Sequence, residues 1–305
     1  MPSMKPSITV IILTHNEEIH MERCIQSLQE VASKIFIVDS FSTDRTVEIA
    51  ESLGAVVAQH KWKNYADQFQ WGLDNCGSES EWVMRWDADE YFEPNLINEI
   101  KDRLPNLEDD VKGVYLRRQV KFMGRMIKHG DFAPHILLRI WRKGLGRIEQ
   151  RWMDEHIVLP PNSKTLIFEH DMVDDNLKGI TFWVDKHNSY ASREMVDIFN
   201  TKYDLLPNDD SIKENEDPQA KRKRLLKEKA YAKLPPGFRA LLYFCYRYFL
   251  RLGFLDGWQG FIFHSMQGFW YRMLVDVKIM EVEERSGGDV KKVKKILYEE
   301  HGIKL

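Results

Sequence analysis

The sequence predicts an α/β protein in which helices flank a mostly parallel, doubly wound sheet and a helical region follows. Strand and helix patterns alternate through the first hundred residues, an order that builds a parallel sheet. From about Phe182 onward the pattern is helical. We therefore expect an α/β domain over residues 1–180 and a helical C-terminal region over residues 181–305.

The α/β pattern opens with Ile8–Leu13, a continuous apolar run typical of a strand buried on both faces. Apolar residues then recur at helical spacing from Met21 to Leu28, and Gly54 marks the end of a second helix that starts near Asp44. Residues 113–159 mix short strand signals with glycine turns. The other elements expected in this domain are strands over Lys34–Val38, Ala55–Ala58 and Trp82–Trp86, and helices over Tyr65–Asp74 and from Pro94 onward.

Composition narrows the class of protein. The formal net charge is −3, so the chain lacks the basic field that nucleic-acid binding requires. The three cysteines show neither metal-site spacing nor a disulfide framework, which fits a reducing cytoplasm. The N-terminus lacks a signal-peptide layout, and no window reaches the roughly 20 apolar residues of a membrane-spanning helix. We expect a cytoplasmic protein.

Polar side chains follow three of the predicted strands at the point where each strand ends. The first strand leads into Thr14–Glu17, the second into Asp39–Asp44, and the Trp82–Trp86 strand into Asp87–Glu90. Open α/β sheets bind ligands at the carboxyl ends of their strands. We therefore expect the three clusters to form one site.

Asp87 and Asp89 give the strongest of these signals. Two carboxylates one residue apart, where a strand becomes a loop, can meet one hard cation such as Mg²⁺ or Mn²⁺. A diphosphate leaving group needs such a charge clamp. The alternative is a solvated acidic turn, which the apolar strand before the motif disfavours.

With these polar clusters, the sequence resembles the inverting glycosyltransferases of family 2, which use the nucleotide-sugar-binding fold called GT-A. The core motifs of that resemblance are T-H-N-E, D-S-F-S-T-D and the metal motif D-x-D, at Thr14–Glu17, Asp39–Asp44 and Asp87–Asp89. Three further strings are similar to the subset that acts in lipopolysaccharide core and exopolysaccharide assembly, at Met84–Phe92, Phe122–Arg125 and Trp152–His156.

The resemblance implies a Rossmann-like GT-A domain that binds a nucleotide-diphosphate sugar, with UDP as the default nucleotide, together with Mn²⁺ or Mg²⁺. His15 lies where an aromatic residue packs near the nucleobase, and Asp39 where a carboxylate accepts a hydrogen bond from the base. Asp87 would face the sugar–ribose side of the donor, and Asp89 would bind the metal. The full set expected to bind the donor is Thr14, His15, Asn16, Glu17, Asp39, Ser40, Gln68, Trp86 and Asp87.

Four positions depart from the family pattern. Ser40 replaces the usual second acid and Phe41 a usual glycine, which leaves the identity of the nucleotide open. Trp86 either walls the sugar pocket or is a core tryptophan at the end of a strand. Gln68 stands near the place where many relatives carry an arginine or asparagine facing the donor, and a plain amphipathic helix is the alternative.

Inverting transfer needs a base that takes the proton of the acceptor hydroxyl as this attacks the anomeric carbon. Adjacent residues of an extended segment point to opposite sides, so Asp154 and Glu155 cannot both face the acceptor. The subset that the chain resembles has an acid and a histidine in this loop, and from that pattern we select Asp154 as the base, with Glu155 close behind. His156 is a metal ligand, a diphosphate contact or an ordinary hydrogen-bonded histidine. Asp131 is the runner-up base. Arg139 either compensates the diphosphate or solubilises the end of a strand.

The C-terminal helices carry more aromatic side chains than packing on one face requires. One helical stripe runs from Phe238 to Leu252, the turn Leu255–Gly257 follows, and a second helix begins after it. Helices rich in aromatics and arginine can lie in the membrane interface, and the basic run Lys221–Arg224 would add attraction to anionic lipid. We expect peripheral membrane association. The alternative is a helical hairpin buried on the catalytic domain or in a homodimer.

The sequence thus predicts a metal-dependent hexosyltransferase at the inner face of the cytoplasmic membrane. It would move a sugar from a nucleotide-diphosphate sugar to a hydroxyl of a glycan or lipid-linked acceptor in surface-polysaccharide or lipopolysaccharide biosynthesis. The alternative is a degenerate transferase scaffold that only binds partners or membrane. Retention of the acids argues against it, since charges gathered at one site cost stability unless they have a function. These acids are Asp39, Asp87, Asp89 and Asp154. A sugar-phosphate nucleotidyltransferase would need a G-x-G-x-R loop where this chain has T-H-N-E.

Overall fold

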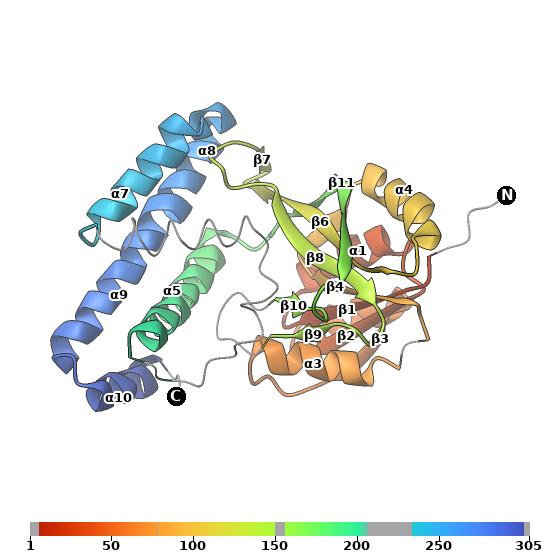
Figure 1. Ribbon diagram of the computed structural model, residues 1–305, viewed down its shortest axis with the longest axis horizontal. Coiled ribbons are helices and arrows are strands. Elements are labelled where there is room, and N and C mark those ends of the chain that lie inside the picture. Colours follow the sequence, from red (N-terminus) through yellow and green to blue (C-terminus); the bar gives the residue numbers. More distant parts are fainter. Residues whose placement is uncertain (1–5, 78, 150–155, 204, 206–233, 302–305) are drawn as a thin grey trace. The chain divides into compact units, whose positions relative to one another are not determined.

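The computed structural model describes residues 6–77, 79–149, 156–203, 205 and 234–301. The chain divides into two compact units (Figure 1). Among the described residues, the first unit extends to Lys178, except for the short turn His129–Asp131. The second unit comprises this turn and the chain from Gly179 onward.

The first unit is built on a nine-stranded sheet with the order β3-β2-β1-β4-β8-β6-β11-β5, and β7 pairs with β6 outside this path. Strands β1 to β4 form a parallel half, because β1 pairs with β2 and β4 and β2 pairs with β3 in the same direction. Strand β8 runs antiparallel to both β4 and β6. The strands are β1 Ile8–Thr14, β2 Lys34–Asp39, β3 Val56–Gln59, β4 Trp82–Asp87, β5 Glu90–Phe92, β6 Val111–Phe122, β7 Arg125–Ile127, β8 His135–Arg142 and β11 Lys164–Asp174. Strands β9 (Arg147–Ile148) and β10 (Ile157–Val158) form a separate pair.

Helices cover both faces of this sheet, so both faces of the central strands are apolar. Val10 and Ile12 of β1 point to one face, where they join one core cluster with α1 (Glu18–Leu28), α2 (Thr46–Ser52) and α4 (Pro94–Arg103). Ile11 points to the other face and joins a second cluster with α3 (Tyr65–Asn75). Gly72 lets α3 approach closely, because a Cβ there would lie 2.9 Å from Cγ2 of Val38. The predicted doubly wound, mostly parallel arrangement is thereby confirmed.

The second half of the sheet differs from the expectation of short strands. Strand β6 is twelve residues long, and the eleven-residue β11, which the sequence pattern does not predict, pairs with it in parallel. The register between these strands shifts between Ile167 and Asp171. This irregularity breaks the alternation of apolar and polar residues by which a strand is found in a sequence.

The second unit is helical. Its elements are α5 Ile180–Tyr203, α7 Phe238–Cys245 with a π-helical continuation Tyr246–Leu250, a 3₁₀ turn Gly253–Asp256, α8 Gly257–Phe263 with a π-helical continuation His264–Trp270, α9 Tyr271–Ser286 and α10 Val290–His301. Its core joins Met195 and Phe199 of α5 to Val282 of α9 and Leu297 of α10. The chain turns between Leu252 and Gly257, where the sequence predicts a break. Over the ranges that the structure describes, no helix combines the length and the apolar character needed to cross a membrane.

Candidate active site

The carboxyl ends of β1, β2 and β4 lie side by side. The strand register pairs Thr14 with Asp39 and Leu13 with Asp87. The polar clusters that follow these strands therefore meet at one edge of the sheet, as expected from the parallel order.

Hydrogen bonds join the first two clusters into one framework. Oδ1 of Asp39 accepts hydrogen bonds from the Thr14 hydroxyl at 2.9 Å and from the Ser42 hydroxyl at 2.5 Å. The Asn16 N–H donates to Oγ of Ser42 at 2.8 Å, and Oδ1 of Asn16 accepts from the Thr43 N–H at 2.8 Å. Asp39 and Thr14 are buried by these contacts. These hydrogen bonds join the two turns to each other.

Two aromatic side chains of these turns face outward. Phe41 is 53% exposed and has φ of 59°, in the left-handed region that glycine adopts most easily. Members of the family that the sequence resembles usually have a glycine at this position, and a left-handed φ is the conformation that glycine adopts most easily. His15 is also exposed. The surface of the framework formed by the two turns therefore offers two rings to a ligand.

Glu17 fixes the start of α1. Its carboxylate lies 2.7 Å from Nδ1 of His20 and 2.7 Å from Nζ of Lys178. Nε2 of His20 accepts a hydrogen bond from the Leu177 N–H at 2.8 Å, so Nδ1 carries the ring proton and donates it to Glu17. These contacts tie the loop after β1 to the chain after β11.

Gln68 is completely buried beneath the second cluster. Its Nε2 donates to Oγ of Ser40 at 3.0 Å and to the carbonyl oxygen of His60 at 3.1 Å, and its Oε1 pairs with Nδ1 of His60 at 2.8 Å. Its amide thus holds Ser40 and His60 in place. This burial argues against the direct contact with the donor that was expected for Gln68.

The acidic motif after β4 surrounds a buried arginine. Nη2 of Arg139, from β8, lies 2.5 Å from Oε1 of Glu90 and 3.2 Å from Oδ2 of Asp87. The hydroxyl of Tyr65 donates to the other oxygen of Asp87 at 3.1 Å, and the Asp87 N–H donates to Glu90 at 3.1 Å. Arg139 and Glu90 are buried. Arg139 is therefore an internal counter-ion of the motif, not the solubilising end of a strand.

The two carboxylates titrate differently. Burial raises the pKa of Asp87, but Arg139, Arg85 and Arg118 outweigh it and hold the pKa well below its usual range. Burial, aided by the charge of Asp87 and opposed by Arg139, raises the pKa of Glu90 to about 8. Of the two acids next to Arg139, Asp87 is therefore the one that is ionised at neutral pH.

Asp89 is partly exposed, as Asp87 is. Its Oδ2 accepts a hydrogen bond from Nδ2 of Asn176 at 2.8 Å, and its carbonyl oxygen accepts from the Asp175 N–H at 3.0 Å. Asp175 forms ion pairs with Arg23 at 2.7 Å and Lys121 at 3.1 Å. The segment after β11 thus fixes the orientation of Asp89 through Asp175 and Asn176.

The donor set suits a hard cation held by few protein ligands. Within the described ranges, no group of three or more His, Cys, Asp or Glu side chains could hold a metal ion by itself. Mg²⁺ is commonly bound through one or two carboxylates, with water and substrate phosphates as its other ligands. Asp89 offers one such carboxylate, and Asp87 next to it is engaged by Arg139 and Tyr65.

Several other predicted residues lie elsewhere. Trp86 is completely buried in the core and its ring N–H donates to the carbonyl oxygen of Glu90 at 3.2 Å, so it is a core tryptophan and does not line a pocket. His156 is exposed, with Nδ1 3.8 Å from Oε2 of Glu149. Asp154 and Glu155 lie outside the described residues. Asp131 belongs to the second unit, where Nη2 of Arg251 lies 2.9 Å from its carboxylate.

The sequence patterns do not predict the residues that support the acidic motif. Tyr65, Glu90 and Asn176 contact Asp87 or Asp89; Glu90 was expected only as a member of the polar cluster, and Tyr65 and Asn176 were not expected. Glu90 carries a signal, because it follows the D-x-D motif directly. Tyr65 and Asn176 carry none, since they reach the motif only through the packing of α3 and the pairing of β11.

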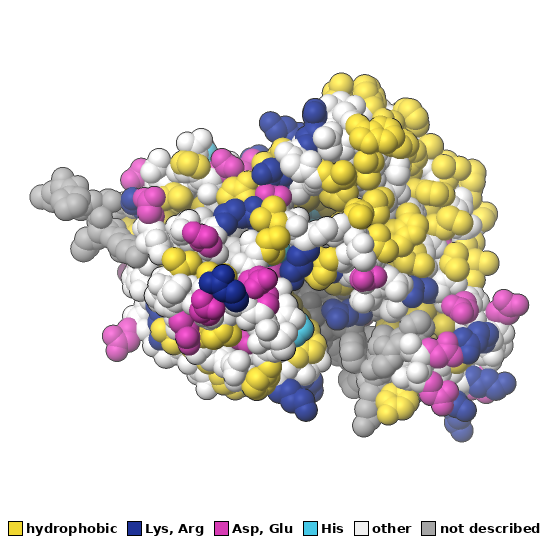
Figure 2. Space-filling view, turned by 180° about the vertical axis from the view of Figure 1, so that it is seen from behind, with side chains coloured by type: hydrophobic (Ala, Val, Ile, Leu, Met, Phe, Trp, Pro, Cys, Tyr) yellow, Lys and Arg dark blue, Asp and Glu magenta, His cyan; other side chains and the backbone are white. Residues whose placement is uncertain are grey.

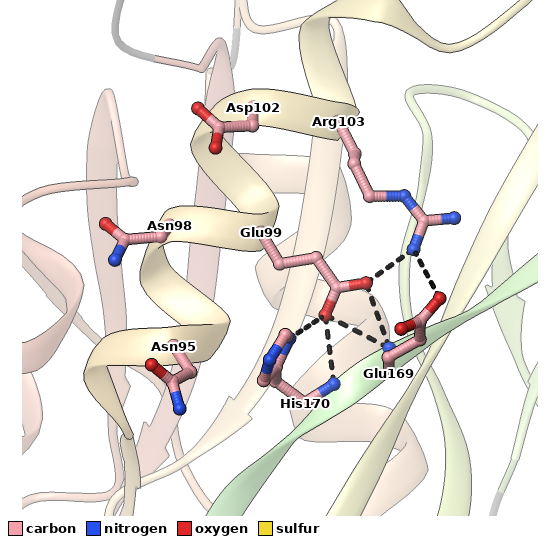
Figure 3. A pocket seen from close by; sticks show the side chains of 7 residues that line it. All are labelled: Asn95, Asn98, Glu99, Asp102, Arg103, Glu169 and His170. Carbon is pink, nitrogen blue, oxygen red and sulfur yellow. Dashed lines mark hydrogen bonds and ion pairs between the residues drawn. The ribbon is translucent and has the colours of Figure 1, made fainter.

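A groove of about 320 Å³ lies between α4 and β11, away from the strand ends (Figure 3). Its centre is Glu99, whose carboxylate accepts hydrogen bonds from the N–H groups of Glu169 and His170 at 2.9 Å. Arg103 lies 2.5 Å from the same carboxylate. These N–H groups belong to the irregular stretch of β11, so Glu99 satisfies backbone donors that lack a strand partner there. We assign this groove a structural role.

Comparisons with known proteins agree with this site. A model of "Glycosyl transferase family 2" matches residues 9–169. An uncharacterized glycosyltransferase of Rickettsia bellii is 36% identical over 129 residues, which cover 42% of each chain. A lipopolysaccharide core biosynthesis glycosyltransferase, LpsC of Rhizobium meliloti, is 30% identical over 150 residues, covering 48% of this chain and 54% of that protein. The chain thus spans only about half of the length of the curated relatives that it matches.

Among solved structures, a mannosyltransferase from Pyrobaculum calidifontis in complex with GDP-Man and Mn²⁺ is similar over 92% of this chain and 88% of its own, with 14% identity and a TM-score of 0.47. The family model covers more than half of this chain and spans all three clusters at the strand ends. The chain therefore belongs to glycosyl transferase family 2.

Proposed function

We propose that this protein transfers a sugar from a nucleotide-diphosphate sugar to a hydroxyl group, with inversion at the anomeric carbon. The observation that carries the proposal is the meeting of three polar clusters at the carboxyl ends of β1, β2 and β4. The first two clusters each offer an exposed ring, and the third offers the partly exposed carboxylate of Asp89 beside the buried ion pair of Arg139 and Glu90. A nucleotide and a diphosphate need these two kinds of surface.

The nucleotide is proposed to bind on the two joined turns. His15 and Phe41 would contact the base, while Asn16 and Ser40 offer polar groups next to them. Asp39, Thr14, Glu17 and Gln68 are engaged inside the protein, so we assign them the task of fixing the turns. UDP remains the default nucleotide.

Asp89 is proposed to hold Mn²⁺ or Mg²⁺ together with oxygens of the donor diphosphate, and His156 stays a candidate for a further contact. A bound cation supplies charge stabilisation for the departing diphosphate. The protein's own contribution is to keep Asp89 oriented through Asn176 and to keep Asp87 ionised through Arg139. Glu90, whose pKa is raised, adds less negative charge at neutral pH than its position suggests.

The acceptor is proposed to be a glycan or lipid-linked glycan of the cell surface. The relative from Rhizobium meliloti is named for lipopolysaccharide core biosynthesis, and we extend that class of acceptor to this chain. The free cysteines, two of which are buried, fit a reducing compartment, so we place the reaction in the cytoplasm.

Asp154 is proposed to take the proton of the acceptor hydroxyl. Asp154→Asn should lower the rate of transfer by about 10² to 10⁴, the usual contribution of a general base, while the dissociation constant of the donor stays unchanged. Single-turnover transfer from a labelled donor to the extracted surface glycan measures the rate, and calorimetry measures donor binding.

Glu155→Gln and Asp131→Asn are the matched controls, since each removes the carboxylate of another candidate for the same role. Both should keep most of the transfer rate; Asp131 already pairs with Arg251. Full activity of Asp154→Asn, or loss of donor binding in that variant, would remove Asp154 from this role.

A further inference from the structure

The segment between β11 and the second unit contacts two of the three polar clusters at the strand ends. We call Asp175–Lys178 the strap. The Asp175 N–H donates to the carbonyl oxygen of Asp89 at 3.0 Å, and the Leu177 N–H donates to Nε2 of His20 at 2.8 Å. The strap therefore lies against the acidic motif and against the start of α1.

Lys178, the last residue of the strap, places a cation between these two clusters. Its N–H donates to Oδ1 of Asn176 at 2.9 Å, and Nδ2 of the same Asn176 donates to Oδ2 of Asp89 at 2.8 Å. Nζ of Lys178 lies 2.7 Å from Oε1 of Glu17, in the turn after β1. The side chains of Lys178 and Glu17 are 17% and 18% exposed, so this ion pair is not sealed from the solvent.

The start of α1 does not offer its N–H groups to a phosphate. Phosphates in α/β proteins commonly bind to N–H groups at the start of the first helix. Here three successive N–H groups already donate to side chains of the second cluster, namely Asn16 to Ser42 at 2.8 Å, Glu17 to Thr46 at 2.7 Å and Glu18 to Asp44 at 3.1 Å. A diphosphate at the strand ends therefore needs compensating charge from other groups.

Other cations next to the acidic motif are bound to acids of the protein. Arg23 donates from Nη1 to the carboxylate of Asp175 at 2.7 Å and from Nη2 to its carbonyl oxygen at 2.6 Å. Nζ of Lys121 lies 3.1 Å from the same carboxylate, which is buried. Arg139 is itself buried between Asp87 and Glu90. These contacts hold the motif and the strap together.

The strap does not depend on Lys178 for its position. The bonds from Arg23 to Asp175 and from Leu177 to His20 already hold it, and Glu17 keeps its contact with Nδ1 of His20 at 2.7 Å when the ammonium group moves. A lysine has three N–H donors on a flexible stem, and it binds phosphate as a point charge. The ammonium group can therefore turn from Glu17 to a phosphate oxygen while the strap stays in place.

We propose that Lys178 binds the diphosphate of the nucleotide-sugar donor, next to the cation assigned to Asp89. The inference rests on the proposed function and adds a residue to its donor site. A diphosphate would bring further negative charge close to Asp87, Asp89 and Glu17, and a lysine at this border offsets it. The competing role is a structural one, in which Lys178 only neutralises Glu17.

Calorimetric titration of the full chain with UDP, GDP and ADP at constant Mn²⁺ tests this proposal. Lys178→Met should weaken the binding of the diphosphate that the wild type binds by about tenfold or more, because a hydrogen bond between charged groups is lost. Lys178→Arg keeps the charge and should retain most of the affinity. The matched control is Lys101→Met, which removes a lysine of α4 that pairs with Glu30 at 3.0 Å and should bind as the wild type does.

The corresponding nucleoside separates phosphate binding from a structural role. Lys178→Met should leave the affinity for the nucleoside, measured by saturation-transfer NMR, as it is in the wild type. A structural role would loosen the turn after β1 and weaken the binding of nucleoside and diphosphate to the same extent.

A measurement on the wild type covers the event that Lys178→Met fails to fold. A saturating diphosphate should slow the acetylation of Lys178, followed by mass spectrometry, and leave that of Lys101 unchanged. Unchanged acetylation of Lys178, equal diphosphate binding by the folded Lys178→Met variant, or equal losses for nucleoside and diphosphate would overturn the inference and leave the proposed function intact. A wild type that binds none of the diphosphates would overturn both.

Discussion

Arg139 connects the buried Glu90 to the partly buried Asp87, and its position explains why one arginine matters more than the many on the surface. Its guanidinium contacts Asp87 and Glu90 at once, and Arg139 itself is buried. A buried charge that loses its partner is costly, whereas an exposed ion pair adds little. The fold of the site therefore depends on a residue from a strand that runs antiparallel to the one that carries the motif.

Arg139→Met should lower the free energy of unfolding by about 3–5 kcal/mol, because it removes the cation that directly contacts Asp87 and the buried Glu90. Denaturation in urea, followed by circular dichroism, measures the loss. Arg45→Met is the control, since Arg45 pairs with Glu48 on the exposed surface and its loss should change the free energy of unfolding much less. Equal effects of the two substitutions would contradict the role assigned to Arg139.

Elements with an unbroken apolar pattern were predicted well from the sequence. The strands expected over Ile8–Leu13 and Lys34–Val38 each extend one residue further in the structure, and Gly54 ends α2 as expected. Strand β11 was missed, because its register shift and its exposed polar residues hide the alternation. The meeting of Thr14, Asp39 and Asp87 followed from the parallel order, but the partners Tyr65 and Arg139 come from elements whose packing no local pattern encodes.

Glu99 supports β11 at its irregular stretch, and its titration should be visible in the stability of the protein. Burial would raise the pKa of Glu99, but the N–H groups of Glu169 and His170, the His170 ring and Arg103 outweigh it, so the pKa lies below its usual value. A carboxyl group with a lowered pKa in the folded state stabilises the fold above its unfolded pKa, near 4.5, and loses this contribution as the pH falls through the folded value.

Glu99→Gln should therefore lower the free energy of unfolding by about 1–3 kcal/mol at neutral pH, where backbone donors lose a charged acceptor. The difference from the wild type should stay constant down to about pH 4.5 and shrink below it. Urea titrations over a pH series measure this difference, with the exposed Glu51→Gln as the control. A difference that grows as the pH falls would contradict a lowered pKa for Glu99.

At the scale of the whole molecule, the family model and the C-terminal helices concern different parts of the chain. The family model matches residues 9–169, within the part of the chain that holds the sheet, and the helices of the second unit lie beyond it. Family membership therefore bears on the site at the strand ends and not on these helices. Both membrane binding and internal packing are compatible with the sequence of the aromatic C-terminal helices, because composition does not reveal which side chains are exposed. Figure 2 shows hydrophobic side chains gathered along one side of the helical unit, and Leu250, Phe254 and Trp258 of this unit are 75%, 45% and 69% exposed.

The exposed apolar side chains of the helical unit and the donor site should be separable by mutation. The combined variant Leu250→Ser, Phe254→Ser and Trp258→Ser should bind a nucleotide-sugar donor in solution with the affinity of the wild type, because the clusters at the strand ends belong to the first unit. Calorimetry of the two proteins makes this comparison. Loss of donor binding in the folded variant would mean that the two units do not act independently.

Calorimetric titration of a panel of nucleotide sugars, with and without Mn²⁺, tests the proposed transfer most directly. We predict that one donor binds, that a chelator abolishes its binding, and that Asp89→Ala lacks it. The control variant Asp102→Ala, which removes an exposed acid of α4, should bind the donor as the wild type does. A folded, metal-supplied protein that binds no donor of the panel would contradict the proposed transfer and favour a scaffold that binds partners or membrane.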